Sequence, residues 1–244
     1  ADTEGFAENM KKQKELARTS RKVGEDEAWK EADLELDVPA TTFTGYEKLE
    51  EEGNILALMD EGGLAETASE GQKVKIILDK TPFYAEGGGQ VNDNGFMSTG
   101  LGEVRIEKVE KKDGVFYHSG TVVKGEINSG NTVLAHVDHI KRNKTARNHT
   151  ATHLLQKALR EVLGTHVQQA GSMVNEKLLR FDFSHFEAVT KEQLAQVEEM
   201  VNDAINKFLD VTATEMTMEE AQKAGAMALF GEKYGNVVRV VNAG

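Results

Sequence analysis

Residues 148–162 read Asn-His-Thr-Ala-Thr-His-Leu-Leu-Gln-Lys-Ala-Leu-Arg-Glu-Val and are followed by Leu163 and Gly164. Apolar residues recur here at spacings of three and four, the period of an amphipathic helix. They are Ala151, Leu154, Leu155, Ala158, Leu159 and Val162. Gly164 is a suitable C-terminal stop, since glycine adopts the left-handed conformation that ends many helices. The stretch therefore predicts a helix with one core-facing side, within an α+β region that spans residues 141–244.

Two histidines, His149 and His153, lie on the side of this predicted helix opposite the apolar stripe. The i, i+4 spacing lets two imidazoles reach one metal ion from a single helix face. Ordinary surface histidines are the alternative, and the spacing does not choose between them. No glutamate follows His149, so the His-Glu-x-x-His motif of zinc proteases is absent. A stable zinc site needs three or four ligands, so His166 or His185 could contribute only if the fold brings them near.

Charge is distributed unevenly along the chain. The formal net charge of −12 argues against a generic nucleic-acid binder, which needs clustered lysine and arginine. Residues 141–180, however, hold eight basic and two acidic residues. The basic ones are Lys141, Arg142, Lys144, Arg147, Lys157, Arg160, Lys177 and Arg180. This window is either a solvated basic face or a local contact surface for nucleic acid.

Upstream of residue 140 the pattern changes to short β-rich runs. They are Thr41 to Phe43, Asn54 to Met59, Gln72 to Leu78, Gly102 to Val109, Val115 to Ser119 and Thr132 to Val137. Turn signals such as Glu61-Gly62-Gly63 and Asp113-Gly114 separate them. Short strands at this spacing predict a small β-barrel over residues 36–140.

Three adjacent glycines follow an aromatic pair in the stretch Thr81-Pro82-Phe83-Tyr84-Ala85-Glu86-Gly87-Gly88-Gly89-Gln90. Glycines leave backbone amides accessible to a ligand. The stretch lacks the Gly-x-x-x-x-Gly-Lys spacing of a phosphate loop, and no helical pattern follows it. From the residues alone, a glycine turn between barrel strands is the favoured interpretation.

The remaining segments complete the predicted architecture. Residues 1–35 form a connector, with an exposed helix from Gly5 to Lys30. A second amphipathic helix is indicated by Leu194, Val197, Val201, Ala204, Ile205 and Phe208, and a third by a capping box at Thr217 to Glu220. The run Val237-Val238-Arg239-Val240-Val241 predicts a buried strand. We therefore expect a barrel followed by an α+β domain.

Composition excludes several classes of protein. No stretch approaches eighteen consecutive apolar residues, and the chain start has neither a basic nor an apolar leader pattern. The 244 residues contain no cysteine, so disulfides and thiolate metal sites are excluded within them. We expect a cytoplasmic protein with no membrane partner.

Several motifs together resemble the alanyl-tRNA synthetase family. Residues 83–90, with Asp93 and Gly95, are similar to the family stretch Phe-Tyr-Ala-Glu-Ser-Gly-Gly-Gln, with Gly87 in place of the usual serine. Further signatures of its editing region follow in order: residues 147–155, Gln169-Ala170-Gly171-Ser172, Arg180-Phe181-Asp182-Phe183, and residues 225–234. The resemblance covers essentially the whole chain and includes the N-terminal helix.

The resemblance implies a small β-barrel followed by an α+β editing domain of the threonyl/alanyl-tRNA synthetase type. Its reaction would be hydrolysis of the ester that joins a wrong seryl or glycyl group to tRNA(Ala). Zinc would be held by two histidines, which map onto His149 and His153, and by a later Cys-x-x-x-His that these residues do not contain. Two of the four expected zinc ligands are therefore present. The resemblance also implies that this region works together with the rest of an ATP-binding synthetase chain.

The same resemblance implies roles for other residues. The substrate-binding residues would be Thr150, Gln169, Gly171, Ser172, Gly88, Gly89 and Gln90. Lys141, Arg142, Lys144 and Arg147 would meet the acceptor end of the tRNA. No catalytic side chain is assigned. Ser172 as a turn residue, Gln169 as a surface amide, and Arg180 with Asp182 as a structural ion pair are the alternatives.

Three hypotheses remain open. The chain is an editing portion of a synthetase, a free-standing editing hydrolase that acts in trans, or a non-catalytic tRNA-binding module. The N-terminal connector helix favours the first, and the missing ligand pair favours the third.

Overall fold

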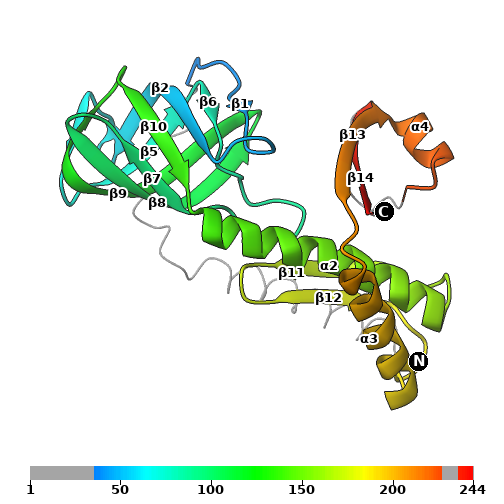
Figure 1. Cartoon of the computed structure of the whole chain (residues 1–244). Coiled ribbons are helices and arrows are strands. Elements are labelled where there is room, and N and C mark those ends of the chain that lie inside the picture. Colours follow the sequence, from blue (N-terminus) through cyan, green and yellow to red (C-terminus); the bar gives the residue numbers. More distant parts are fainter. Residues whose placement is uncertain (1–35, 227–235, 244) are drawn as a thin grey trace, which may run out of the picture. The chain divides into compact units, whose positions relative to one another are not determined.

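The computed structural model describes residues 36–226 and 236–243 (Figure 1). The predicted helix from Gly5 to Lys30 lies outside these residues. The chain divides into two compact units, each described below by itself. The first comprises Ala1–Pro82 and Gly95–His136, and the second comprises Phe83–Asn94 and Val137–Gly244. The glycine-rich stretch thus lies between barrel strands in sequence but belongs to the second unit.

Six strands of the first unit form a closed barrel (Figure 1). They are β2 (Glu50–Asp60), β5 (Lys73–Leu78), β7 (Gly95–Ser98), β8 (Gly102–Lys112), β9 (Val115–Asn128) and β10 (Thr132–Val137). Their order is β10-β7-β8-β9-β5-β2, and β10 pairs with β2 to close the ring. The barrel predicted from the sequence is confirmed. β7 was not among the predicted strands, because the four residues Gly-Phe-Met-Ser carry too short a pattern.

The barrel core follows from alternation along these strands. Val104 and Ile106 of β8, Val122 of β9 and Val133 of β10 are buried, and residues between them are exposed or half-buried. Each buried aliphatic side chain contributes roughly 1.5–3 kcal/mol by leaving water. Closure leaves these six strands without a free edge.

Four short strands lie beside the barrel. β1 (Thr42–Phe43) pairs in parallel with β6 (Lys80–Thr81), β3 (Gly63–Leu64) extends β2, and β4 (Thr67–Ser69) pairs with β9. The turn signals predicted at residues 61–63 and 113–114 lie where strands reverse, since Gly63, Asp113 and Gly114 all have positive φ.

The second unit is built around the long helix α2 (His139–Leu163). Asp138 caps its start by accepting a hydrogen bond from the Lys141 backbone N–H at 3.0 Å, and Gly164, with a φ of 116°, ends it. The predicted helix is therefore confirmed and begins earlier than its apolar pattern indicated. No helix in residues 36–226 and 236–243 has the length and hydropathy that crossing a membrane requires.

The hairpin of β11 (Gln169–Val174) and β12 (Leu179–Phe183) packs against α2, as does helix α3 (Lys191–Asn206) (Figure 1). Their common core contains Ala158, Leu159, Val167 and Val197, with Phe181, Phe183 and Met200 packed around it. Leu155, Ala158, Leu159 and Val162 of the predicted stripe thus belong to this core, whereas Ala151 and Leu154 are half-buried outside it. Three predicted members of the α3 stripe differ: Leu194 and Ile205 are exposed, and Phe208 lies beyond the helix end with a φ of 49°.

The last elements are β13 (Val211–Thr217), α4 (Met218–Lys223) and β14 (Val237–Ala243). The capping box predicted at Thr217 and Glu220 is present, with both reciprocal hydrogen bonds formed. β14 is a strand as predicted and pairs antiparallel with β13. The prediction that it is buried is wrong: Val237 and Val241 are exposed, because in the described residues this is a two-stranded sheet.

Candidate functional site

The glycine-rich stretch forms a tight two-residue turn. The backbone N–H of Gly87 donates to the carbonyl of Gln90 at 3.1 Å, and the N–H of Gln90 donates back at 3.0 Å. Gly88 and Gly89 between them have φ values of 58° and 79°. Two consecutive positive φ angles are typical of a type I′ turn, which disfavours side chains with a Cβ. The glycines are therefore needed for the shape of this turn.

This turn docks on β11. The carbonyl of Gly89 accepts from the Val174 N–H at 2.8 Å, and the Val91 N–H donates to the Val174 carbonyl at 3.0 Å. A Cβ at Gly89 would lie 2.8 Å from the Ser172 carbonyl oxygen and 3.0 Å from its hydroxyl oxygen. Glycine is thus also required by close approach. The fold thus places Gly89 against Ser172 and joins the glycine turn to Val174 of the same strand.

A partly buried ion pair holds the far end of the same loop to α2. The guanidinium Nε of Arg142 donates to both carboxylate oxygens of Asp93, at 2.9 and 3.0 Å, and its Nη2 contacts the same carboxylate. Only 6% of the Asp93 side chain and 12% of the Arg142 side chain are exposed. The Tyr84 N–H also donates to Asp93, at 2.7 Å. Asp93 and Arg142 thus fasten residues 83–94 to the helix.

The two histidines of α2 lie next to this loop. The Nδ1 of His149 is 2.7 Å from the side-chain carbonyl oxygen of Gln90. The rings of His149 and His153 are stacked, with centroids 5.2 Å apart and an interplanar angle of 20°. Neither residue belongs to the apolar core cluster around Leu159. Both histidines therefore lie outside the apolar core, as their position opposite the apolar stripe predicted.

Burial lowers the pKa of both imidazoles below the ordinary value. Desolvation is the largest cause at His149, and the positive charge of His153 lowers the His149 pKa further. The pKa of His153 is lowered by desolvation, although the residue is exposed overall. Both rings are therefore neutral at pH 7, the form that can offer a ring nitrogen to a metal.

Thr150, Gln169 and Gly171 lie at other points around the helix and hairpin. Thr150 is half-buried and adjoins His149 in sequence. Gln169 and Val174 are the two ends of β11. Five residues of strand separate their Cα atoms by about 16 Å. A Cβ at Gly171 would lie 2.8 Å from the Asp182 carboxylate. The described contacts therefore unite the glycine turn, Ser172 and His149, but they do not bring Gln169 to this group.

The predicted tRNA-contacting residues occupy two different environments. Lys144 and Arg147 are exposed on α2, and the exposed Lys141 donates to the Asn94 side chain at 3.1 Å. Arg142 is committed to Asp93. Arg180 and Asp182 form the ion pair that was the alternative to a functional role, with 61% and 47% of their side chains exposed.

His166 and His185 contact each other, with Nε2 and Nδ1 2.9 Å apart, and Phe186 stacks on His166. Among residues 36–226 and 236–243 no group of three or more metal-ligating side chains is assembled. His149 and His153 thus form one stacked pair in the described chain, and His166 and His185 form another.

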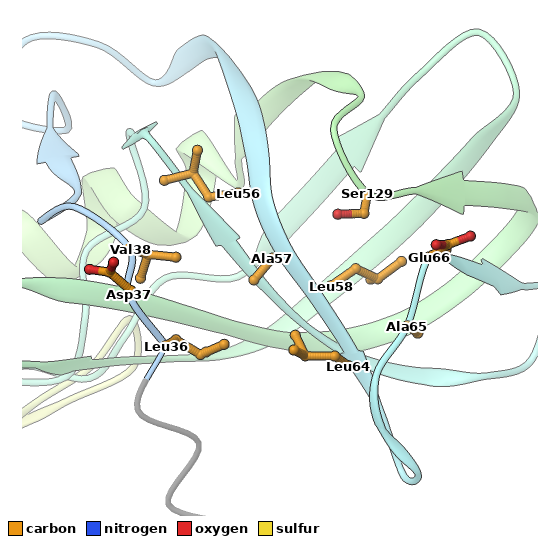
Figure 2. A pocket seen from close by; sticks show the side chains of 10 residues that line it. All are labelled: Leu36, Asp37, Val38, Leu56, Ala57, Leu58, Leu64, Ala65, Glu66 and Ser129. Carbon is orange, nitrogen blue, oxygen red and sulfur yellow. The ribbon is translucent and has the colours of Figure 1, made fainter.

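A hollow of about 480 Å³ lies on the barrel unit (Figure 2). Its lining is mainly aliphatic and includes Leu36, Val38, Leu56 and Leu64, with Asp37 and Glu66 as its acids. It contains neither histidine nor lysine nor arginine among its lining residues. The candidate site residues His149 and His153 are not part of this hollow.

Sequence reasoning assigned no role to Asp93, although it lies within the recognised motif. The signal available was an acidic residue three positions after Gln90, in a loop otherwise poor in charge. Its partner Arg142 is 49 residues away, which a local pattern cannot reveal.

Comparison with known proteins places these residues in a family context. Residues 1–141 match the family model of the class II (A) tRNA synthetases. Over the whole chain, the alanine–tRNA ligases of Bacillus subtilis (strain 168) and Pelotomaculum thermopropionicum are 48% and 47% identical. The chain spans about 28% of the length of these relatives. The resemblance to alanyl-tRNA synthetases drawn from the sequence motifs is confirmed.

Proposed function

Because the chain belongs to the class II tRNA synthetase family, we propose that it is the editing portion of an alanine–tRNA ligase. Its reaction is hydrolysis of the ester that links a mistaken seryl or glycyl group to the terminal ribose of tRNA(Ala). The observation that carries this proposal is the convergence of Gln90, His149 and Ser172, from three separate segments, beside a glycine turn.

The need for such a reaction follows from the physics of small pockets. A site sized for alanine gains little discrimination against glycine, which lacks one methyl group, or against serine, which adds only a hydroxyl. One methylene is worth only about 1–3 kcal/mol in a hydrophobic pocket. A second site that destroys the wrong product supplies the missing accuracy.

The two imidazoles fit a zinc ion by donor type and charge. Both lie on one helix face, both are neutral at pH 7 because burial lowers their pKa, and zinc prefers neutral imidazole nitrogen. When bound, zinc would supply a fixed positive charge that orients the substrate or polarises water. The further Cys-x-x-x-His pair of the family is not among these 244 residues, so His149 and His153 supply half of the proposed ligand set.

The remaining residues act on the substrate. Ser172 and the backbone of Gly88 and Gly89 form one wall of the amino-acid pocket, with Thr150 beside the ligands and Gln169 and Gly171 further along β11. Exposed Lys141, Lys144 and Arg147 attract the phosphates of the acceptor end. Arg142 contributes by holding the loop, since its guanidinium is bound to Asp93. The cytoplasm, where tRNA is charged, is the proposed location.

A deacylation assay on the full-length ligase tests this proposal. His149→Ala should lower the rate of Ser-tRNA(Ala) hydrolysis at least about 100-fold. Loss of a residue that hydrogen-bonds to a metal ligand already lowers activity about 10- to 100-fold, and loss of the ligand itself should lower it more. His166→Ala, which removes a similarly half-buried histidine, should leave hydrolysis unchanged. Equal hydrolysis by wild type and His149→Ala would refute the proposal and favour a non-catalytic tRNA-binding module.

A further inference from the structure

We infer that Gln90 is a positioning residue that fixes the tautomer of His149. It holds the hydrogen of the imidazole on Nδ1 and so leaves the lone pair of Nε2 directed away from Gln90. The inference deepens the proposed function and rests on it for the identity of the ligand that Nε2 serves. The family resemblance alone implies only that Gln90 is one of the substrate-binding residues.

The first step is the hydrogen bond itself. The side-chain oxygen of Gln90 lies 2.7 Å from Nδ1 of His149. A carbonyl oxygen can only accept, so Nδ1 must be the donor. A neutral imidazole has one N–H, and Nε2 is therefore an acceptor with a free lone pair. In the described part of the chain no hydrogen bond reaches Nε2 from another side chain.

The second step is the rigidity of Gln90. Gln90 is only 7% exposed. Its backbone N–H and carbonyl are both hydrogen-bonded to Gly87. Both neighbours of Gln90 are bonded to Val174 of β11: the Gly89 carbonyl accepts from the Val174 N–H, and the Val91 N–H donates to the Val174 carbonyl. The fixed backbone and the burial of the side chain together hold the amide beside the ring.

The third step is the chemical consequence. Histidines that bind metals donate their other ring N–H to a carbonyl or carboxylate, which fixes ring orientation and raises ligand basicity. An imidazole without such a partner favours the Nε2–H form in water, which would block Nε2. By holding the hydrogen on Nδ1, Gln90 therefore leaves Nε2 of His149 unprotonated and able to bind a metal ion.

The inference is tested on the 244-residue chain without metal or tRNA. Long-range 1H–15N correlation NMR on protein labelled with [15N]histidine reports which ring nitrogen carries hydrogen. The spectra are recorded near pH 8, where histidine is neutral, and His149→Asn identifies the His149 signals by their loss. We expect Nδ1–H in the wild type, a shift toward Nε2–H in Gln90→Ala, and retention of Nδ1–H in Gln90→Glu, whose carboxylate also accepts.

Gln193→Ala is the matched control, because it removes a glutamine that bonds the backbone at the start of α3. It should leave the His149 tautomer unchanged. In the full-length ligase, Gln90→Ala should also weaken zinc binding about 10- to 100-fold. An Nε2–H ring in the wild type, or an unchanged tautomer in Gln90→Ala, would overturn the inference. Failure of deacylation with the tautomer effect intact would instead count against the proposed function alone.

Discussion

The barrel holds a fully buried histidine and the second unit a half-buried one, and the two rings are hydrogen-bonded differently. In the barrel, His118 is fully buried, with Nδ1 bonded to the Ile76 carbonyl at 3.0 Å and Nε2 to the Thr81 hydroxyl at 2.8 Å. In the other unit, His149 is half-buried and is bonded through Nδ1 to Gln90. A ring with both nitrogens used stabilises a fold, whereas a ring with one nitrogen left over is available for chemistry. His118 thus has both ring nitrogens bonded within the barrel, whereas His149 keeps one ring nitrogen for a ligand.

The largest loss of stability is expected from a change in the packing of the barrel. Gly125 of β9 has a φ of 63°, and a Cβ there would lie 2.0 Å from the Leu101 carbonyl oxygen. Gly125→Ala should therefore destabilise the chain by about 4 kcal/mol or more, the range of severe core disruption. Urea unfolding followed by circular dichroism measures this change.

Gly130→Ala is the control for backbone conformation. Gly130 has a similar φ of 78° but nothing within 4 Å of its added Cβ, so only the left-handed strain of about 1–2 kcal/mol should appear. Equal losses for the two variants would mean that close packing at Gly125 does not matter.

The ion pair that fastens the loop to α2 should give the next largest effect. Asp93→Asn leaves the guanidinium of Arg142 buried without its counter-charge, which typically costs about 3–5 kcal/mol. Hydrogen exchange should show loss of protection in residues 83–94. Arg180→Gln breaks the exposed pair with Asp182 and should cost less than about 1 kcal/mol. If both variants cost the same, the Asp93 pair does not hold the loop.

Acid should weaken the barrel through His118. Burial lowers the pKa of His118 from 6.5 to about 4, so the folded state resists protonation while the unfolded state accepts it. The stabilisation is complete above pH 6.5 and is lost as the pH falls toward 4. At about 1.4 kcal/mol per pKa unit, the total is about 3 kcal/mol.

Unfolding free energies at several pH values, compared between wild type and His118→Asn, isolate this contribution. The variant should be less stable at pH 7 but should lose less stability between neutral and acidic pH. Parallel pH profiles for the two proteins would show that His118 is not the titrating group.

A smaller effect is expected from the electrostatic interaction between His149 and His153 of α2. The charge of His153 contributes to the lowered pKa of His149, so His153→Ala should raise the His149 pKa toward its ordinary value. An NMR titration of the ring signals measures the shift. An unchanged or lower pKa would show that the rings are not electrostatically coupled.

The sequence predicted those features that follow from local periodicity. Alternating residues and turn signals predicted the barrel, because a closed sheet has one buried face. The stripe from Leu155 to Val162 predicted which side of α2 meets the core, and the capping pattern at Thr217 predicted the start of α4.

Features that depend on distant segments were not predicted. The short strand β7 has too few residues for a periodic signal, and the docking of Gly89 on Val174 joins positions 85 residues apart. The Asp93 and Arg142 pair is equally non-local. The exposure of Val237 and Val241 was missed because an apolar run indicates burial only where a second layer covers it. For the candidate site, spacing indicated His149 and His153 and the family resemblance indicated Gln90, but the contact of Gln90 with His149 required the fold.

The central claim is that His149 and His153 are half of a zinc-dependent editing site, and a paired measurement of zinc content and deacylation tests it directly. The 244-residue chain should bind zinc weakly and hydrolyse Ser-tRNA(Ala) slowly, because an ion with two of four ligands loses its closed shell. A chain extended through the expected Cys-x-x-x-His should gain zinc binding and hydrolysis together, and His149→Ala in that longer chain should abolish both. Tight stoichiometric zinc in the 244 residues alone, or hydrolysis restored without zinc, would contradict the account.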